Sequence, residues 1–341
     1  MRMIEPTAAV PILDARLLEA GPEARARFVT QLVEACRGTG CFQLLHPPLP
    51  SGLSREALQA ARDFFALPLE EKLALDIAHS QHFRGYSRMS NGRDWREQLH
   101  LGREEPPGGL DSEPTYLRLQ GPNPWPRDER WRRVFLTYLH AVEAVGHQLL
   151  EALAQGLGLT GNPFAEELAK EPYLVMKLIH YLPQPGAEAP PRSGVASHCD
   201  FSWLTLLLQD ELGGLQVRSS SGEWVDVEPR PDALVVNLGE LMQMATRGVF
   251  QATPHRVTNR SHEKARTSIP VFLCPNLRSR VTPLPVPHEW AAPPCVDPAH
   301  VHRVVPLERM PRAEHPLAPF VFGEAEWKRK GRGIWCAECC A

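Results

Sequence analysis

Two histidines and one aspartate stand at spacings that could build a metal site. His198 and Asp200 lie two positions apart in the run Ser197–Leu204, whose composition predicts a strand. Because side chains alternate along a strand, both would lie on one face. His255, from a second strand, would complete a set of two imidazoles and one carboxylate. This set suits Fe(II) and leaves coordination positions open for oxygen chemistry.

A second pair of residues follows His255 closely in the chain. Arg266 and Ser268 again share a face at a spacing of two. A guanidinium fork beside a hydroxyl makes a clamp for a small carboxylate. Either pattern alone is also typical of a surface strand with polar residues facing water. It is the order of the whole series, with the Gly213-Gly214 turn between the histidines, that indicates a metal centre.

The bulk properties exclude several classes of protein. The chain has 341 residues, 37 basic and 40 acidic, and a formal net charge of −3, so no general polyanion-binding surface is implied. No apolar stretch approaches the ~18 residues of a membrane span, and Met1–Pro6 lacks the apolar block of a secretion signal. We therefore expect a cytoplasmic protein, a monomer or weak homodimer, with neither nucleic-acid nor membrane partners.

The cysteines do not predict a disulfide framework. There are eight, spread unevenly over a long chain. Cys336, Cys339 and Cys340 form a cluster at the end of the sequence that could hold zinc or form a disulfide. A four-coordinate zinc site needs a further ligand, so an untethered tail is the other interpretation.

The first half of the chain alternates helical patterns with short apolar runs. The runs at Val10–Asp14 and Gly40–Leu45 predict strands. Between Gly85 and Gly109 the pattern is loop-like, except for a β-prone piece at Glu97–Leu101. Apolar residues recur at helical spacing in four segments: Pro22–Arg37, Ser54–Phe65, Pro68–Lys72 and Arg127–Gly156.

From Tyr173 onward short strands separated by Gly and Pro turns predominate. The expected strands are Leu174–Ile179, Trp203–Gln209, Leu212–Val217, Trp224–Val227, Ala233–Leu238, Arg256–Thr258 and Ser268–Leu273. They predict a mainly β protein with a double-stranded β-helix (jelly-roll) core, flanked by N-terminal helices that include one long helix. Such a core brings distant strands together at one open end. We divide the chain into an N-terminal α/β region (1–120), the long helix with its support (121–171), the core (172–282) and a Pro-rich C-terminal extension (283–341), which we expect to pack against the core.

The chain resembles the isopenicillin N synthase-like branch of the Fe(II)/2-oxoglutarate-dependent oxygenases. In the N-terminal region the resemblance rests on Val10–Asp14, Gly40–Gln43 and Phe64–Lys72. In the core it rests on His198–Asp200, Gly213–Val217, Asn237–Glu240, Pro254–Val257 and Arg266–Ser268. Together these motifs cover nearly all of the chain. They are specific for the family and carry little information on the substrate.

The resemblance implies roles for matching residues. Fe(II) would be held by His198, Asp200 and His255. The distal carboxylate of 2-oxoglutarate would be bound by Arg266, Ser268 and the hydroxyl of Tyr181. Two departures from the family pattern stand out: Leu182 where a proline usually follows the tyrosine, and His46-Pro47-Pro48 in place of a His-Gly.

The residues that would face the substrate are the least defined. Arg84, Tyr86, Arg88, Trp95 and Arg96 lie in the region that lines the mouth of the site in relatives. Several cations there would suit an acidic or amino-acid-like substrate. The alternative is a long loop with surface arginines.

The family's activity is to couple oxidation of a small molecule to the decarboxylation of 2-oxoglutarate. With Fe(II) and O2 the expected products are succinate, CO2 and a substrate hydroxylated, desaturated or cyclised at an unactivated C–H bond; the expected substrate is a specialised metabolite. A second possibility is an iron oxidase of the isopenicillin N synthase or aminocyclopropane-carboxylate oxidase type, which needs no 2-oxoglutarate. A third is a non-catalytic jelly-roll binding protein that retains the metal site.

Overall fold

The structure is a computed structural model of the 341-residue chain. It describes residues 10–90, 94–106, 114–159, 161–164, 171–184, 192–219, 221–286, 290 and 319–334. The predicted cysteine cluster near the C-terminus and most of the Pro-rich segment lie outside these residues.

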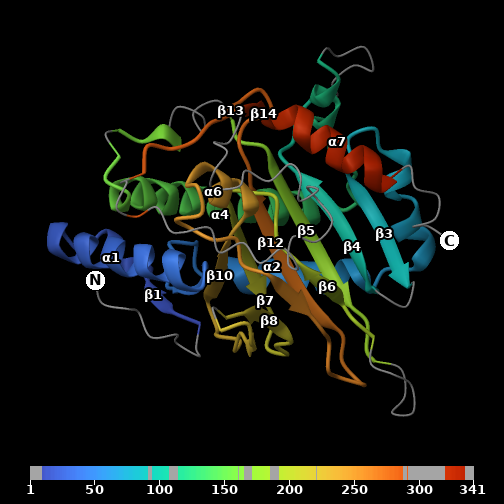
Figure 1. Ribbon diagram of the computed structural model, residues 1–341. Coiled ribbons are helices and arrows are strands. Elements are labelled where there is room, and N and C mark those ends of the chain that lie inside the picture. Colours follow the sequence, from blue (N-terminus) through green and yellow to red (C-terminus); the bar gives the residue numbers. More distant parts are fainter. Residues whose placement is uncertain are drawn as a thin grey trace.

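The larger of two facing sheets has eight strands (Figure 1). Apart from β1, which runs parallel to β2, neighbouring strands are antiparallel. In spatial order they are β1 (Ile12–Asp14), β2 (Cys41–Leu45), β10 (Ala233–Leu238), β7 (Leu204–Gln209), β12 (Arg266–Leu273), β5 (Leu174–Tyr181), β4 (Trp95–Gly102) and β3 (Gly85–Ser90).

The smaller sheet has four antiparallel strands and packs on the inner face of the larger one. Its order is β6 (Val195–His198), β11 (His255–Val257), β8 (Leu215–Arg218) and β9 (Trp224–Asp226). Ile179 and Leu207 of the large sheet share an apolar cluster with Val217 and Val257 of the small sheet. The two sheets therefore form the jelly-roll core that the sequence predicts.

The alternation of side chains along β7 shows how the large sheet serves two layers. Leu204, Leu206 and Leu208 belong to the main hydrophobic core, on the side of the helices. Thr205 and Leu207 point the other way and line a cavity between the sheets. A strand buried on both faces explains why this segment of the sequence is almost uniformly apolar.

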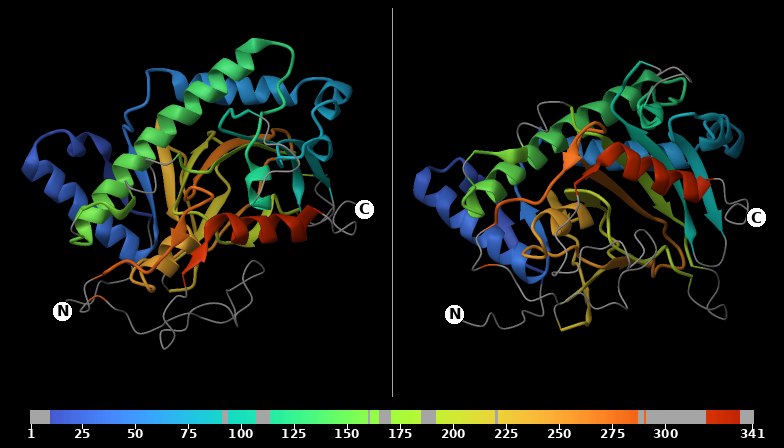
Figure 2. Two further views of the ribbon diagram at one scale, coloured as in Figure 1. Left: turned by 90° about the horizontal axis from the view of Figure 1, so that it is seen from above. Right: turned by 45° about the horizontal axis from the view of Figure 1, so that its top comes forward.

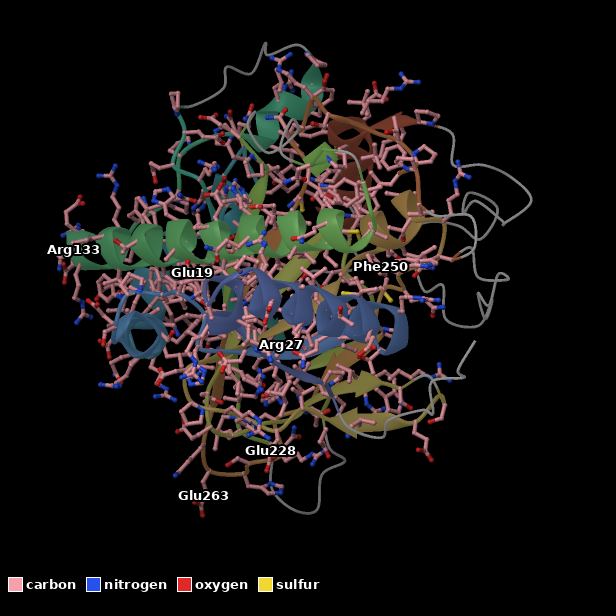
Figure 3. The ribbon with its side chains drawn as sticks, turned by 90° about the vertical axis from the view of Figure 1, so that its left-hand side faces the viewer. Glu19, Arg27, Arg133, Glu228, Phe250 and Glu263 are labelled. Atoms are coloured by element: carbon pink, nitrogen blue, oxygen red, sulfur yellow. The ribbon has the colours of Figure 1, made fainter. Side chains whose placement is uncertain are left out.

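Helices cover the outer face of the large sheet (Figure 2). The longest, α4 (Glu129–Gly156), lies beside α1 (Pro22–Gly38), as Figure 3 shows in a view of the left-hand side of Figure 1, with Arg133 near the start of α4. Within the described residues, no helix combines the length and apolarity needed to cross a bilayer. The remaining helices are α2 (Leu53–Phe65), α3 (Leu69–Leu73), α6 (Glu240–Ala245) and α7 (Phe322–Ile334), with short 3-10 helices at Ala15–Leu18, Ile77–His79 and Thr115–Leu119.

The segment predicted as a loop between Gly85 and Gly109 is different in the structure. It contains the hairpin of β3 and β4, which extends the large sheet beyond β5. The β-prone piece at Glu97–Leu101 is confirmed as part of β4, whereas the loop prediction was wrong for β3, which carries Arg88 and two serines, a composition typical of solvated turns. β3 is stabilised by pairing with β4 and by the burial of Tyr86 in the main core.

The described part of the C-terminal extension packs on the core. β14 (Phe320–Val321) pairs with β13 (Arg280–Val281) and leads into α7, which lies across the ends of β3 and β4 in Figure 1. Phe322 stacks on Phe201 with ring centroids 6.0 Å apart. The extension therefore closes one end of the large sheet.

The helix layer yields a first prediction. Leu149 of α4 is fully buried in the main core, and Leu149→Ala should lower the free energy of unfolding by about 2–5 kcal/mol because it leaves a cavity. His140 on the same helix is exposed, so His140→Ala should change it by no more than ~0.5 kcal/mol. Urea denaturation of both variants measures the difference, and equal losses would contradict the assignment of the α4 faces.

Candidate metal centre and carboxylate site

The two histidines and the aspartate converge at one end of the small sheet. In the pairing of β6 with β11, His198 lies opposite His255, and their ring centroids are 4.3 Å apart. Asp200 follows two residues after the end of β6. One ligand atom from each of the three residues lies within 4.8 Å of the others. The three residues converge as predicted, but the predicted strand at Ser197–Leu204 was wrong: residues 199–203 are not in a strand, and Asp200 reaches the cluster from the segment after β6.

Backbone carbonyls fix the orientation of both imidazoles. Nδ1 of His198 lies 2.9 Å from the carbonyl oxygen of Ala196, and Nδ1 of His255 lies 2.9 Å from that of Thr253. A carbonyl oxygen only accepts, so we assign the ring proton to Nδ1 in both residues. The lone pair on each Nε2 then faces Oδ1 of Asp200, at 3.5 Å from His198 and 3.7 Å from His255.

Oδ2, the second carboxylate oxygen of Asp200, accepts two hydrogen bonds from neighbouring side chains. Thr205 Oγ1 donates to Oδ2 at 2.6 Å, and Asn237 Nδ2 donates to the same atom at 2.9 Å. Burial acts to raise the pKa of Asp200, but the neighbouring His255, His198 and Thr205 outweigh it and hold this pKa well below its usual range. Asp200 is therefore ionised, with Oδ1 free to bind a cation.

The donor set fits a divalent transition metal. Burial is the largest influence on the pKa of His255 and lowers it, so this imidazole is neutral at neutral pH. Nε2 of His198, Nε2 of His255 and Oδ1 of Asp200 then face a common point. Such an arrangement is repulsive without a cation, and two histidines with one carboxylate are the ligands that non-haem Fe(II) prefers.

A second polar cluster lies on β12. Arg266 is fully buried; its Nε donates to the carbonyl of Gly213 at 2.5 Å and its Nη2 donates to Gln209 Oε1 at 2.9 Å. Its guanidinium carbon lies 4.9 Å from the ring centre of Tyr181. Nη1 of Arg266 and Oγ of Ser268 are buried and have no hydrogen-bond partner among the described residues. Since each orphaned polar group costs about 1–3 kcal/mol, the pair suits an incoming carboxylate.

The Gly213-Gly214 turn positions the acceptor for Arg266. Both residues have positive φ angles, +68° and +84°. A Cβ added to Gly214 would lie 2.1 Å from the carbonyl oxygen of Thr258, so only glycine allows this close approach of the two backbones. The turn brings the Gly213 carbonyl to the guanidinium.

Both clusters adjoin one cavity of about 870 Å³ between the sheets. The cavity is lined by the three residues of the metal cluster and by Tyr181 and Ser268. Its volume is typical of a small-molecule site.

A buried thiol lies on the same cavity. Cys41 of β2 lines it, and burial, with a contribution from the charge of Asp200, raises the pKa of Cys41 to about 12. The side chain is therefore a neutral thiol in the folded protein.

Of the residues predicted to face the substrate, the structure places Arg96 in the cavity lining. Arg84 is buried elsewhere and donates to the carbonyl of Leu101 at 2.9 Å, and Tyr86 is buried in the main core. The side chain of Arg88 is 45% exposed and lies 3.9 Å from Glu97. The strand order explains this division: Arg96 lies on β4, next to β5, whereas Tyr86 and Arg88 lie on the edge strand β3 and Arg84 just before it.

The sequence analysis did not predict two charged residues of the cavity lining. Asp94 precedes β4, and Lys177 lies on β5. A signal for Lys177 was present, because it is four positions before Tyr181 and so on the same face of a strand. The apolar run around it favoured a reading of the strand as pure core.

The support of Asp200 gives a prediction about stability. Thr205→Val keeps the shape of the side chain but removes a hydroxyl that donates to a buried carboxylate, so it should lower the free energy of unfolding by about 1–3 kcal/mol. Thr267 is the matched control, because its buried hydroxyl has no partner among the described residues. Thr267→Val should be neutral or slightly stabilising. Urea denaturation of metal-free protein at pH 7 tests both; a loss at Thr267 as large as at Thr205 would refute the argument.

Two family models match the chain. Residues 10–128 match the N-terminal region of non-haem dioxygenases in morphine synthesis, and residues 172–275 match the 2OG-Fe(II) oxygenase superfamily. The second match contains both the His-Asp-His cluster and Arg266 with Ser268.

Individual relatives agree with these matches. A 2-oxoglutarate-Fe(II) type oxidoreductase of Emericella nidulans is 37% identical over 80% of this chain and 80% of its own length. A 2OG-Fe(II) oxygenase family protein from Caulobacter crescentus has a TM-score of 0.74 at 26% identity, covering 96% of this chain and 99% of that one. Neurospora crassa T7H, solved with alpha-KG, shares the fold with a TM-score of 0.76 at 23% identity, covering 96% and 100%. The chain, which carries the His198, Asp200 and His255 cluster, belongs to the 2OG-Fe(II) oxygenase superfamily and is an oxidoreductase that uses Fe(II), 2-oxoglutarate and O2.

Proposed function

We propose that His198, Asp200 and His255 hold the iron and that Arg266 and Ser268 bind the distal carboxylate of 2-oxoglutarate. The observation that carries the proposal is the pair of orphaned donors, Arg266 Nη1 and Ser268 Oγ, beside the cavity that the metal cluster also lines. The reaction is the oxidation of an unactivated C–H bond of a small metabolite by hydroxylation, desaturation or cyclisation, with release of succinate and CO2.

Each protein group has a defined task in this proposal. The iron and its cosubstrate supply the oxidising chemistry when bound. The backbone carbonyls accept from Nδ1 of both histidines and so direct the two Nε2 atoms at the metal position, and Thr205 and Asn237 keep Oδ1 of Asp200 directed there. The ring of Tyr181 packs against the Arg266 guanidinium and limits the directions in which it can move. No side chain is required as a general base.

The carboxylate site is tested through Arg266. Arg266→Met should weaken 2-oxoglutarate binding roughly 10- to 100-fold, because a charge-assisted hydrogen bond is lost in a buried site. Arg266→Lys should retain part of the affinity but not the forked geometry. The absorbance of the Fe(II)–2-oxoglutarate charge-transfer band under anaerobic titration gives the affinities.

Arg27 on α1 is exposed, and Arg27→Met serves as the matched control with unchanged affinity. If the Arg266→Met protein bound 2-oxoglutarate as tightly as the wild type, the clamp would have to lie elsewhere.

The metal cluster is tested by thermal unfolding. A metal that binds only the folded state raises the unfolding midpoint, so Fe(II) under anaerobic conditions, or Mn(II), should raise it for the wild type. Asp200→Ala should abolish this rise. Asp226 is an exposed carboxylate at the end of β9 that pairs with Arg260, and Asp226→Ala should retain the rise. An undiminished shift in the Asp200 variant would exclude the proposed ligand set.

Product analysis separates the proposal from an oxidase that needs no 2-oxoglutarate. When oxygen is admitted to the anaerobic Fe(II)–2-oxoglutarate complex, succinate should form in proportion to the oxygen consumed. Activity on a substrate without any succinate would instead assign Arg266 and Ser268 to the substrate's own carboxylate.

A further inference from the structure

Lys177 of β5 places a positive charge in the cavity. It lies on the same strand face as Ile179 and Tyr181, which also line the cavity. Its side chain is half-buried, and the ammonium lies 5.1 Å from the centre of the Phe272 ring.

The ammonium of Lys177 has no anionic partner among the residues that the structure describes. No hydrogen bond or ion pair joins it to another described residue. The other cations nearby are neutralised: Arg96 pairs with Asp94 at 2.6 Å, and Lys330 lies 3.5 Å from Glu326, which also pairs with Arg329. Lys177 is thus the unbalanced cation of the cavity lining within the described chain.

Burial is the main cause that lowers the pKa of Lys177, to about 7. The neighbouring cations Lys330, Arg96 and Arg329 lower this pKa further, and the charge of Asp200 acts in the opposite direction. An anion beside the ammonium supplies the missing counter-charge and so offsets the effects of burial and of the neighbouring cations on the pKa of Lys177. The site is therefore prepared for a negatively charged ligand.

The register of the sheet separates Lys177 from the carboxylate clamp. Arg266 lies opposite Tyr181 and Ser268 opposite Ile179. Lys177 is four residues from Tyr181, which corresponds to ~13 Å along the strand.

Lys177 is instead near the level of the metal cluster. Phe272, which its ammonium overlies, pairs across the sheet with Thr205, and Thr205 holds Asp200. A ligand bound by Lys177 would therefore lie beside the metal position, clear of Arg266.

Charge balance points to the identity of that ligand. The charges of Fe(II) and the 2-oxoglutarate dianion cancel, and those of Asp200 and Arg266 cancel as well. The ammonium of Lys177 then remains without a counter-ion in the loaded cavity. An uncompensated, partly desolvated cation is unfavourable, and a carboxylate is a suitable partner for it.

We propose that Lys177 binds the negatively charged group of the primary substrate, and that this substrate is a small organic acid. The inference rests on the proposed function, because it assumes that 2-oxoglutarate occupies the Arg266 end of the cavity. Lys177 anchors the carboxylate, and the apolar body of the acid lies against Phe272 with its reacting carbon toward the metal.

Matched acids and amides test this proposal. Benzoate, phenylacetate and hexanoate, each with its amide, are titrated into the anaerobic Fe(II)–2-oxoglutarate enzyme. Calorimetry gives the affinities, and a change in the charge-transfer band shows binding beside the metal. In the wild type at least one acid should bind ten or more times tighter than its amide. Lys177→Met should reduce that ratio to near one without changing the affinity for 2-oxoglutarate, and Lys177→Arg should restore part of it.

Lys264 is exposed, and Lys264→Met is the control that keeps the wild-type preference. A wild type that prefers no acid over its amide overturns the proposal, as does a Lys177→Met protein that keeps the preference or loses 2-oxoglutarate binding. If Lys177→Met fails to fold, Lys177→Arg and Lys177→Gln carry the comparison. Absence of the charge-transfer band in the wild type would refute the proposed function itself, which distinguishes the two failures.

Discussion

The pairing of β6 with β11 is the contact on which the site depends. It sets His198 opposite His255 and leaves Asp200, just past the strand, directed at the same point. Three lone pairs aimed at one place are unfavourable in the empty protein. The fold sustains them through hydrogen bonds from outside the cluster, to the two Nδ1 atoms and to the far oxygen of Asp200. The stability of the folded jelly roll thus keeps the three ligand atoms close together, and a bound cation removes the repulsion between them.

The large sheet contributes by having two different faces. Its outer face packs against the α1, α2 and α4 layer and forms the main hydrophobic core. Its inner face carries charge at separated levels, with Arg266 at one and Lys177 at another. Because the register of β5 and β12 sets that separation, a change in strand pairing would disturb both anion positions together.

Much of this arrangement is predictable from the sequence. The many short strands with Gly and Pro turns indicated a jelly roll, and the order of His198, Asp200, His255 and Arg266 indicated a metal centre. The β4 half of the β3–β4 hairpin was predicted at Glu97–Leu101, but β3 was missed because serines and Arg88 predominate in it and it is an edge strand that pairs with β4. Lys177 was missed because a strand that is buried on both faces shows no alternation of apolar and polar residues. Only its spacing of four from Tyr181 indicated which face the lysine occupies. The division of the chain into four regions remains a prediction.

Cys41 has a consequence for the durability of such an enzyme. A thiolate next to an iron centre would compete for the metal and would be the first group attacked by stray oxidants. The apolar surroundings of Cys41, and the charge of Asp200 beside it, keep the sulfur in its protonated and far less reactive form. The burial of Cys41 therefore protects a thiol that lies on the same cavity as the oxidising chemistry.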